Sequence, residues 1–127
     1  KVVLLARYQR KAIRGLIIPK QFVDSASLVA KADLFIAFGG TITREAALQG
    51  TPAIVINMFP GQYVNDFLAK KGFPIFKADV SNVKRTAVKL LGKKCSVKHL
   101  LDKLENPVDV ITDIVQKTPR ATKAKTV

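Results

Sequence analysis

Residues 37–50 of the chain are AFGGTITREAALQG, and the rest of the fold is organised around this stretch. An apolar run over residues 34–38 leads into it and predicts a buried strand. Two adjacent glycines then lead into a helix that Gly50 and Pro52 end. At a turn from strand to helix, the first backbone N–H groups of the helix lack partners and the positive end of the helix dipole lies behind them. This arrangement favours an anion, most often a phosphate.

Several side chains of this stretch suit a phosphate-bearing ligand. Gly39 and Gly40 would let such a ligand approach the backbone closely. Thr41 and Thr43 offer hydroxyl groups, and Glu45 lies one turn into the helix as an acceptor for a ligand hydroxyl. An ordinary turn explains the same residues, with Thr41 as the N-cap and Glu45 complementing the helix dipole. The pattern is neither a Walker loop nor GxGxxG, so by itself it leaves both interpretations open.

Composition indicates one globular domain. The chain has 127 residues, of which 48% are hydrophobic and 24% charged, enough for a core of its own. No apolar run approaches the roughly 18 residues of a membrane-spanning helix, and the first residues do not resemble a signal peptide. With Cys95 and His99 as the single cysteine and histidine, we expect no disulfide within the chain and no metal site. We expect a cytoplasmic protein.

The net charge of +13, from 22 basic and 9 acidic residues, points to an anionic partner or to a solvated, lysine-rich surface. Basic residues gather over residues 1–20 and again over residues 84–103. Nucleic acid, other phosphate-bearing ligands and acidic membrane surfaces all suit such charge, and the charge does not choose among them. The chain has no Trp and its aromatic residues are scattered, which argues against a dedicated nucleic-acid binder.

Strand and helix patterns alternate along the chain. The expected strands are residues 2–6, 16–19, 34–38, 52–58 and 74–77. This alternation predicts an α/β fold with a Rossmann-like parallel sheet of about five strands and helices on both faces. The ligand crevice of such a sheet lies outside the carboxyl ends of its strands. The residues that we therefore expect on one rim are Arg7, Gly39, Gly40, Asn57 and Gly61.

The expected helices after the glycine turn are residues 62–71, 80–91, 96–104 and 107–117, and another covers residues 26–32. Their expected N-caps are Asp24 or Ser25, Asp79, Ser96 and Asn106. In the helix over residues 62–71, Val64, Phe67 and Leu68 form the expected inner face, and Gly72 ends it. We assign residues 1–117 to one domain. Residues 118–127, TPRATKAKTV, form a basic tail that we expect to be disordered.

Residues 22–56, FVDSASLVAKADLFIAFGGTITREAALQGTPAIVI, resemble the nucleotide-binding C-terminal half of GT-B glycosyltransferases and of UDP-N-acetylglucosamine 2-epimerases. The chain is most similar to an uncharacterised, mainly archaeal family of unknown function. Members of that family carry a similar GGTxxREAALxGTP run after a strand that ends in Arg-Tyr, as at Arg7 and Tyr8. The resemblance covers about residues 1–78 and is specific over residues 24–53.

The resemblance implies a nucleotide-sugar ligand, UDP-sugar or another nucleoside diphosphate sugar, and no cofactor. Gly39, Gly40 and Thr41 would meet the diphosphate, and Glu45 would accept hydrogen bonds from the ribose hydroxyls. The nucleotide and phosphate site would comprise Arg7, Gly39, Gly40, Thr41, Thr43 and Glu45. The donor-sugar side would comprise Asn57, Gly61, Gln62 and Asn65. Phe22 lies where the base-contacting loop of those enzymes runs, although its residue type favours a core position.

Two departures from these enzymes leave catalysis open between a transferase, an epimerase and a binding protein. The epimerases use a histidine in their second-domain loop, whereas His99 lies far beyond the site, where a core or surface residue is the better interpretation. GT-B enzymes also bind substrates between two domains, and the first is absent here, as is a central strand before residues 2–6. We therefore predict that the chain is a fragment of a longer protein and is inactive alone. Its sheet would close up or keep a gap where the central strand is missing. The missing N-terminal domain of the same protein would be its partner.

Two further functions are compatible with the sequence. The first is a non-catalytic basic module that binds nucleic acid or a protein partner through its lysine-rich surface. The second is a structural half-domain that forms a homo-oligomer through an exposed sheet edge.

Overall fold

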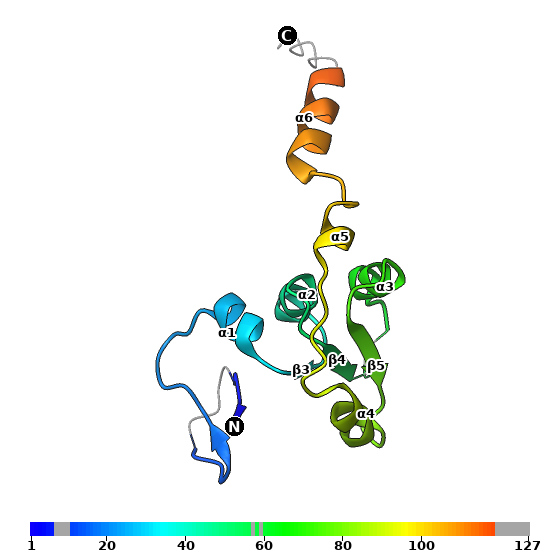
Figure 1. Cartoon of the computed structure of the whole chain (residues 1–127). Helices are drawn as coiled ribbons and strands as arrows, with labels where there is room; N and C mark the ends of the chain where they lie inside the picture. Colours follow the sequence, from blue (N-terminus) through cyan, green and yellow to red (C-terminus); the bar gives the residue numbers. More distant parts are fainter. Residues whose placement is uncertain (7–10, 57, 59, 119–127) are drawn as a thin grey trace, which may run out of the picture. The chain divides into compact units, whose positions relative to one another are not determined.

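The structure is a computed structural model that describes residues 1–6, 11–56, 58 and 60–118. The chain divides into two units, Lys1–Val97 and Lys98–Val127. The second unit contains α5 (Lys98–Leu101) and α6 (Pro107–Lys117), and the other described helices and strands belong to the first (Figure 1). Residues 119–127, nearly all of the predicted tail, lie outside the described residues. No helix of the described part is long and apolar enough to cross a membrane.

The described strands are parallel and form two sheets. β1 (Val2–Val3) pairs with β2 (Leu16–Ile17). β3 (Phe35–Ala37), β4 (Ala53–Ile56) and β5 (Ile75–Ala78) form a second sheet in that order. A helix joins each strand of this second sheet to the next, as parallel neighbours require.

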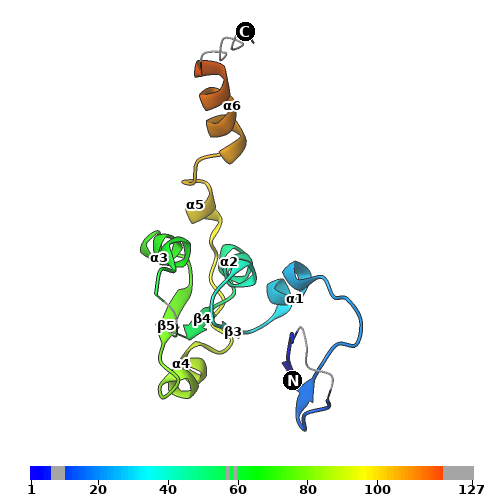
Figure 2. The same ribbon diagram turned by 180° about the vertical axis from the view of Figure 1, so that it is seen from behind.

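The predicted α/β class, with parallel strands and helices on both faces, is confirmed. Helices α2 (Thr41–Leu48) and α3 (Tyr63–Lys70) lie on one face of the β3–β4–β5 sheet, and α4 (Val83–Leu90) lies on the other (Figures 1 and 2). The described residues form five strands, the predicted number, but in two sheets instead of one. The first two strands are also shorter than predicted, because β1 and β2 find ladder partners only in each other among the described strands. Val2 accordingly remains 58% exposed.

The core lies where α1 (Ser25–Lys31) and α2 pack against the three-stranded sheet. Val29, Ala46 and Ala53 form its buried centre, and Phe35 and Ile42 pack against them. In the central strand β4, residues 53–55 are fully buried. This burial explains why β4 is apolar at every position instead of alternating, since helices cover both of its faces.

The segment that follows α4 returns to the end of α2. The backbone N–H of Cys95 donates to the carbonyl oxygen of Gly50 at 3.0 Å, and the N–H of Gly92 donates to the carbonyl of Asp33 at 3.2 Å. Gly50 has a φ of +80°, and a Cβ there would lie 2.0 Å from the Cys95 carbonyl oxygen. The turn that ends α2 therefore needs glycine both for its backbone angle and for its contact with residue 95.

Helix ends follow the predicted caps in part. Asp24 caps α1 by accepting from the N–H of Ala26, and Asn106 caps α6 by accepting from the N–H of Val108. The predictions for Asp79 and Ser96 are wrong. Helix α4 begins at Val83 after Asn82 and has no side-chain cap, because Asp79 contributes only its backbone carbonyl to the turn. Helix α5 is a single turn that starts at Lys98.

Candidate functional site

The glycine turn joins β3 to α2 at the carboxyl end of the strand. Gly39 and Gly40 have φ angles of +108° and +102°, which L side chains rarely adopt. Nothing lies within 4 Å of the position that a Cβ on Gly40 would take, so the turn is open there. Helix α2 has no side-chain cap and no acidic residue in its first turn, and Thr41, its first residue, is exposed. The N–H groups of this turn are therefore available to a ligand or to solvent.

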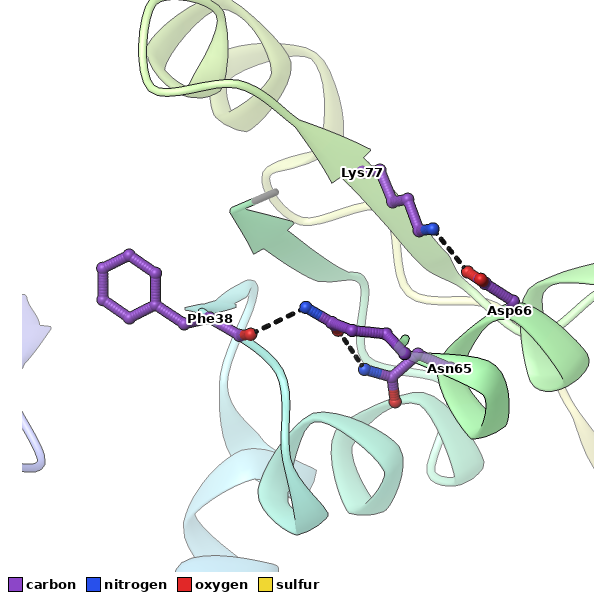
Figure 3. A network of polar contacts seen from close by, with 5 residues as sticks. Phe38, Asn65, Asp66 and Lys77 are labelled. Atoms are coloured by element: carbon purple, nitrogen blue, oxygen red, sulfur yellow. Dashed lines mark hydrogen bonds and ion pairs between the residues drawn. The ribbon is translucent and has the colours of Figure 1, made fainter. Parts of the chain in front are cut away.

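The other side of the turn is held by α3. The side-chain Nε2 of Gln62 donates to the carbonyl oxygen of Phe38 at 3.0 Å, and Nδ2 of Asn65 donates to Oε1 of Gln62 at 2.7 Å (Figure 3). A Cβ on Gly39 would lie 2.5 Å from Gln62 Oε1 and 3.2 Å from Asn65 Nδ2. The ends of β3 and β4 thus meet at one edge of the sheet, as expected for parallel strands.

Asn65 links this turn to α2. It is 1% exposed, and its Oδ1 accepts a hydrogen bond from Nε of Arg44 at 3.2 Å. Of the predicted inner face of α3, only Leu68 is buried, whereas Val64 and Phe67 are 49% and 50% exposed. The prediction is therefore confirmed for Leu68 and wrong for Val64 and Phe67. It also omits Asn65, because apolar periodicity gives no signal for an amide that is buried to bond a distant loop.

Thr43 and Glu45 each have a buried oxygen without a hydrogen-bond partner among the described residues. The atoms are Oγ1 of Thr43, a residue that is fully buried, and Oε2 of the half-buried Glu45. Most buried side-chain oxygens in native proteins have a partner, so each of these atoms points to a missing one: a donor for the Glu45 carboxylate, and an acceptor or donor for the Thr43 hydroxyl.

The position of Glu45 follows from Gln49, one turn further along α2. Gln49 Nε2 donates to the carbonyl oxygen of Ala26 in α1 at 3.1 Å. Because residues four apart share one face of a helix, Glu45 lies on the side of α2 that faces α1. Thr51 donates from Oγ1 to the Val29 carbonyl at 2.8 Å and fixes the two helices further.

Of the other residues predicted near the ligand, the structure describes Gly61 and Phe22. Gly61, with a φ of +82°, belongs to the loop before α3. Arg7, Tyr8 and Asn57 lie outside the described residues. Phe22 is 96% exposed, so its interpretation as a core aromatic is wrong.

His99 is exposed on α5, in the second unit. Of the two predicted positions, core or surface, the structure shows the surface. Within the described residues, no three His, Cys, Asp or Glu side chains lie close enough to hold a metal ion. The sequence analysis did not predict a role for Arg44, although this residue lies in the middle of residues 37–50. The available signal was a basic residue one turn into a helix whose first turn has no acid.

Fold and turn together define the class: an α/β protein with parallel strands and an open glycine turn at the carboxyl end of a sheet strand. The chain belongs to the family described as "Protein of unknown function (DUF354)", whose family model matches residues 2–120. The predicted likeness to an uncharacterised family is thereby confirmed.

One relative is the "Uncharacterized protein MJ0665" of Methanocaldococcus jannaschii, an archaeal protein. It is 31% identical over 101 residues, which are 78% of this chain and 28% of the relative. The matching part of the chain thus spans less than a third of that protein's length. No solved structure matches the chain.

Proposed function

We propose that this chain is the nucleotide-sugar-binding half of a GT-B-like protein and that its ligand is a UDP-sugar or another nucleoside diphosphate sugar. One observation carries the proposal: Oε2 of Glu45 is buried without a hydrogen-bond partner among the described residues. A carboxylate oxygen in that state is costly unless a donor arrives, and the vicinal hydroxyls of a ribose are suitable donors.

The turn beside Glu45 suits the diphosphate. Gly40 leaves open space where a side chain would project, and α2 begins without an acidic residue or a side-chain cap. A phosphate placed over Gly39 and Gly40 would accept from the N–H groups of the first turn and interact favourably with the helix dipole. Thr41 and Thr43 would add hydroxyl groups on the same turn.

Two further features support a nucleotide. Phe22, 96% exposed in the segment before α1, presents an aromatic ring that can stack on a base. Gln62 and Asn65 stand beside Gly39, at the same edge of the sheet. In the resembling enzymes the donor sugar lies on this side of the loop, and here the two amides also hold the loop in place.

In the whole protein this half would hold the leaving group of a glycosyltransferase- or epimerase-like reaction. The start of α2 would stabilise the negative charge that develops on the diphosphate, and the rest of the protein would supply the acceptor and the base. The partner of this half is then another domain of the same protein, in keeping with the 28% of the relative that the match covers.

Calorimetric titration with UDP and UDP-N-acetylglucosamine tests the proposal. We expect saturable binding that is weakened in Glu45→Ala and unchanged in Glu105→Ala, which removes an exposed carboxylate from the second unit. Absence of binding to either nucleotide, or binding indifferent to Glu45, would contradict the proposal.

A specific surface favours the alternative function, the binding of nucleic acid. The exposed face of α4 has a shallow hollow lined by Ser81, Lys84, Arg85, Val88 and Lys89. None of its three basic side chains forms an ion pair with a described residue. Binding of a random DNA duplex that falls steeply with salt and is lost in the triple variant Lys84→Gln/Arg85→Gln/Lys89→Gln would support this alternative. The same variant should leave UDP binding intact.

A further inference from the structure

The charge of Arg44 has no counter-ion among the described residues. Its Nε donates to Asn65, and the side chain is half-buried beside the start of α3. The neighbouring Glu45 forms no ion pair with it. Asp66, which follows Asn65, is paired with Lys77 at 2.6 Å (Figure 3). An anion from outside the described residues would stabilise a partly buried guanidinium in this state.

Two helix dipoles add to this positive charge. Arg44 is the fourth residue of α2 and Asn65 the third residue of α3, and each helix has eight residues. The bond between Arg44 and Asn65 therefore brings the first turns of the two helices together. The partial positive charges of both N-termini and the full charge of Arg44 lie at one edge of the sheet, where Asp66 in the first turn of α3 is paired with Lys77.

A second observation at the same turn points to a ligand. Thr43 is fully buried and its Oγ1 has no hydrogen-bond partner among the described residues. Thr43 is the third residue of α2, and side chains in a helix tilt toward its N-terminus, so this side chain leans toward the end of α2 at which the glycine turn lies. A phosphoryl oxygen would satisfy this hydroxyl as well as the guanidinium.

We propose that Arg44 binds a phosphoryl group of the ligand, with its guanidinium oriented by Asn65. The inference deepens the proposed function and rests on it for the nucleotide part of the ligand only. Because Nε is occupied by Asn65, the terminal Nη1 and Nη2 groups remain as a planar pair of donors, the geometry that receives two phosphate oxygens. A lysine has no equivalent of Nε and cannot bond Asn65 and phosphate in the same way.

Asn65 and Gln62 are the positioning residues of this site. Hydrogen bonds run from Arg44 to Asn65, from Asn65 to Gln62 and from Gln62 to the carbonyl oxygen of Phe38, at 3.2, 2.7 and 3.0 Å. They connect the cation with the loop that precedes Gly39 and Gly40. The guanidinium and the N–H groups of the turn are thereby held in one arrangement before a ligand arrives.

Titration of the full chain with inorganic pyrophosphate and with UDP tests the inference. We expect Arg44→Gln to lower the affinity for both ligands by about 10- to 100-fold, the usual range for a lost charge-assisted hydrogen bond. Arg44→Lys should recover little of this loss, because the planar pair of donors is missing. The matched control is Arg14→Gln, which removes the same charge from an exposed position and should change either affinity by less than about threefold.

The positioning role has its own readout. Asn65→Ala should also lower the affinity for pyrophosphate. The double variant Arg44→Gln/Asn65→Ala should bind pyrophosphate no more weakly than Arg44→Gln alone, since Asn65 acts through Arg44. Far-UV circular dichroism checks that the Asn65 variant folds. If that variant does not fold, Gln62→Ala, at a less buried position, replaces it in the comparison with Arg44→Gln. Additive losses would overturn the positioning role.

The outcomes separate this inference from the proposed function. UDP binding that Arg44→Gln leaves unchanged overturns the inference and leaves the proposed function standing. If pyrophosphate binds in a way that depends on Arg44 and UDP does not bind, the inference is supported and the proposal that the ligand is a nucleotide is rejected. Equal losses in Arg44→Gln and Arg14→Gln would show an unspecific effect of charge and overturn the inference, and absence of binding to either ligand overturns both proposals.

Discussion

The side chain of Gln62 occupies the space that a Cβ on Gly39 would need, with its Oε1 2.5 Å from that position. Gln62 is not free to move aside without loss, because it donates to the Phe38 carbonyl and accepts from Asn65. Gly39 and Gly40 are therefore both required, but for different reasons. Gly39 is required by α3 and by its own backbone angle, and Gly40 by its backbone angle alone.

Gly39→Ala should destabilise the fold more than Gly40→Ala. The φ of +102° and ψ of −172° at Gly40 make alanine cost about 1 to 3 kcal/mol there. At Gly39 the loss of the Gln62 hydrogen bond adds about 1 kcal/mol. Urea denaturation measures the loss of unfolding free energy in both variants. In a Gln62→Ala background, Gly39→Ala should no longer cost the additional amount of about 1 kcal/mol, because the hydrogen bond is already absent. Equal costs at the two glycines would contradict this assignment.

Glu45→Ala should separate binding from stability. Binding of UDP should weaken by roughly 1.5 to 3 kcal/mol through the lost charge-assisted hydrogen bond. The free energy of unfolding should stay the same or rise, since the variant removes a buried carboxylate oxygen that has no partner among the described residues. Calorimetry measures the first and thermal denaturation the second. A variant that lost stability and binding together would indicate a structural role instead.

Gly50→Ala should be the most damaging of the glycine substitutions. A Cβ there would lie 2.0 Å from the backbone oxygen of Cys95, which cannot rotate away as a side chain can. We expect a loss of about 3 kcal/mol or more. Gly92→Ala is the control: its φ of +73° is similar, but nothing lies within 4 Å of the added atom. It should cost about 1 to 2 kcal/mol.

Stability in acid should depend on Asp24. The Ser27 hydroxyl, helped by the backbone N–H groups of Ser27 and Ala26, lowers the pKa of Asp24 below 3.8 in the folded chain. Because the folded pKa is the lower one, this cap stabilises the fold above pH 3.8, and the contribution is lost as the pH falls through the folded pKa.

Asp24→Asn keeps a capping side chain but removes the titration. The unfolding free energy of this variant should fall less steeply than that of the wild type as the pH drops below about 4. Asp33→Asn, at an exposed position outside a helix cap, is the control and should follow the wild type. A wild-type pH profile in Asp24→Asn would show that the cap is not the titrating group.

Sequence reasoning worked best where local and tertiary preferences agree. The strand, glycine turn, helix and strand over residues 35–56 all occur, because their apolar residues form the core and the glycines have the positive φ angles that the turn requires. It worked less well for β1 and β2. An apolar run favours an extended chain, but it does not supply the neighbouring strand that would lengthen and bury it.

The site shows a similar division. Glycines, Thr43 and Glu45 belong to one local motif, so their proximity could be predicted from spacing alone. The bond between Arg44 and Asn65 joins residues that are 21 positions apart. Nothing in a periodic pattern marks a polar residue that is buried for the sake of a distant partner, and Phe22 shows the reverse case of an apolar residue that folding leaves exposed.

The contact between Cys95 and Gly50 sets an order of events during folding. The two residues are 45 positions apart, so this contact forms only after α3, β5 and α4 have been synthesised. Closing a loop of this length is entropically costly and comes after the local contacts of the strand–helix units. We therefore expect the backbone N–H of Cys95, which donates to the Gly50 carbonyl, to gain protection from hydrogen exchange later during folding than the N–H groups within α2.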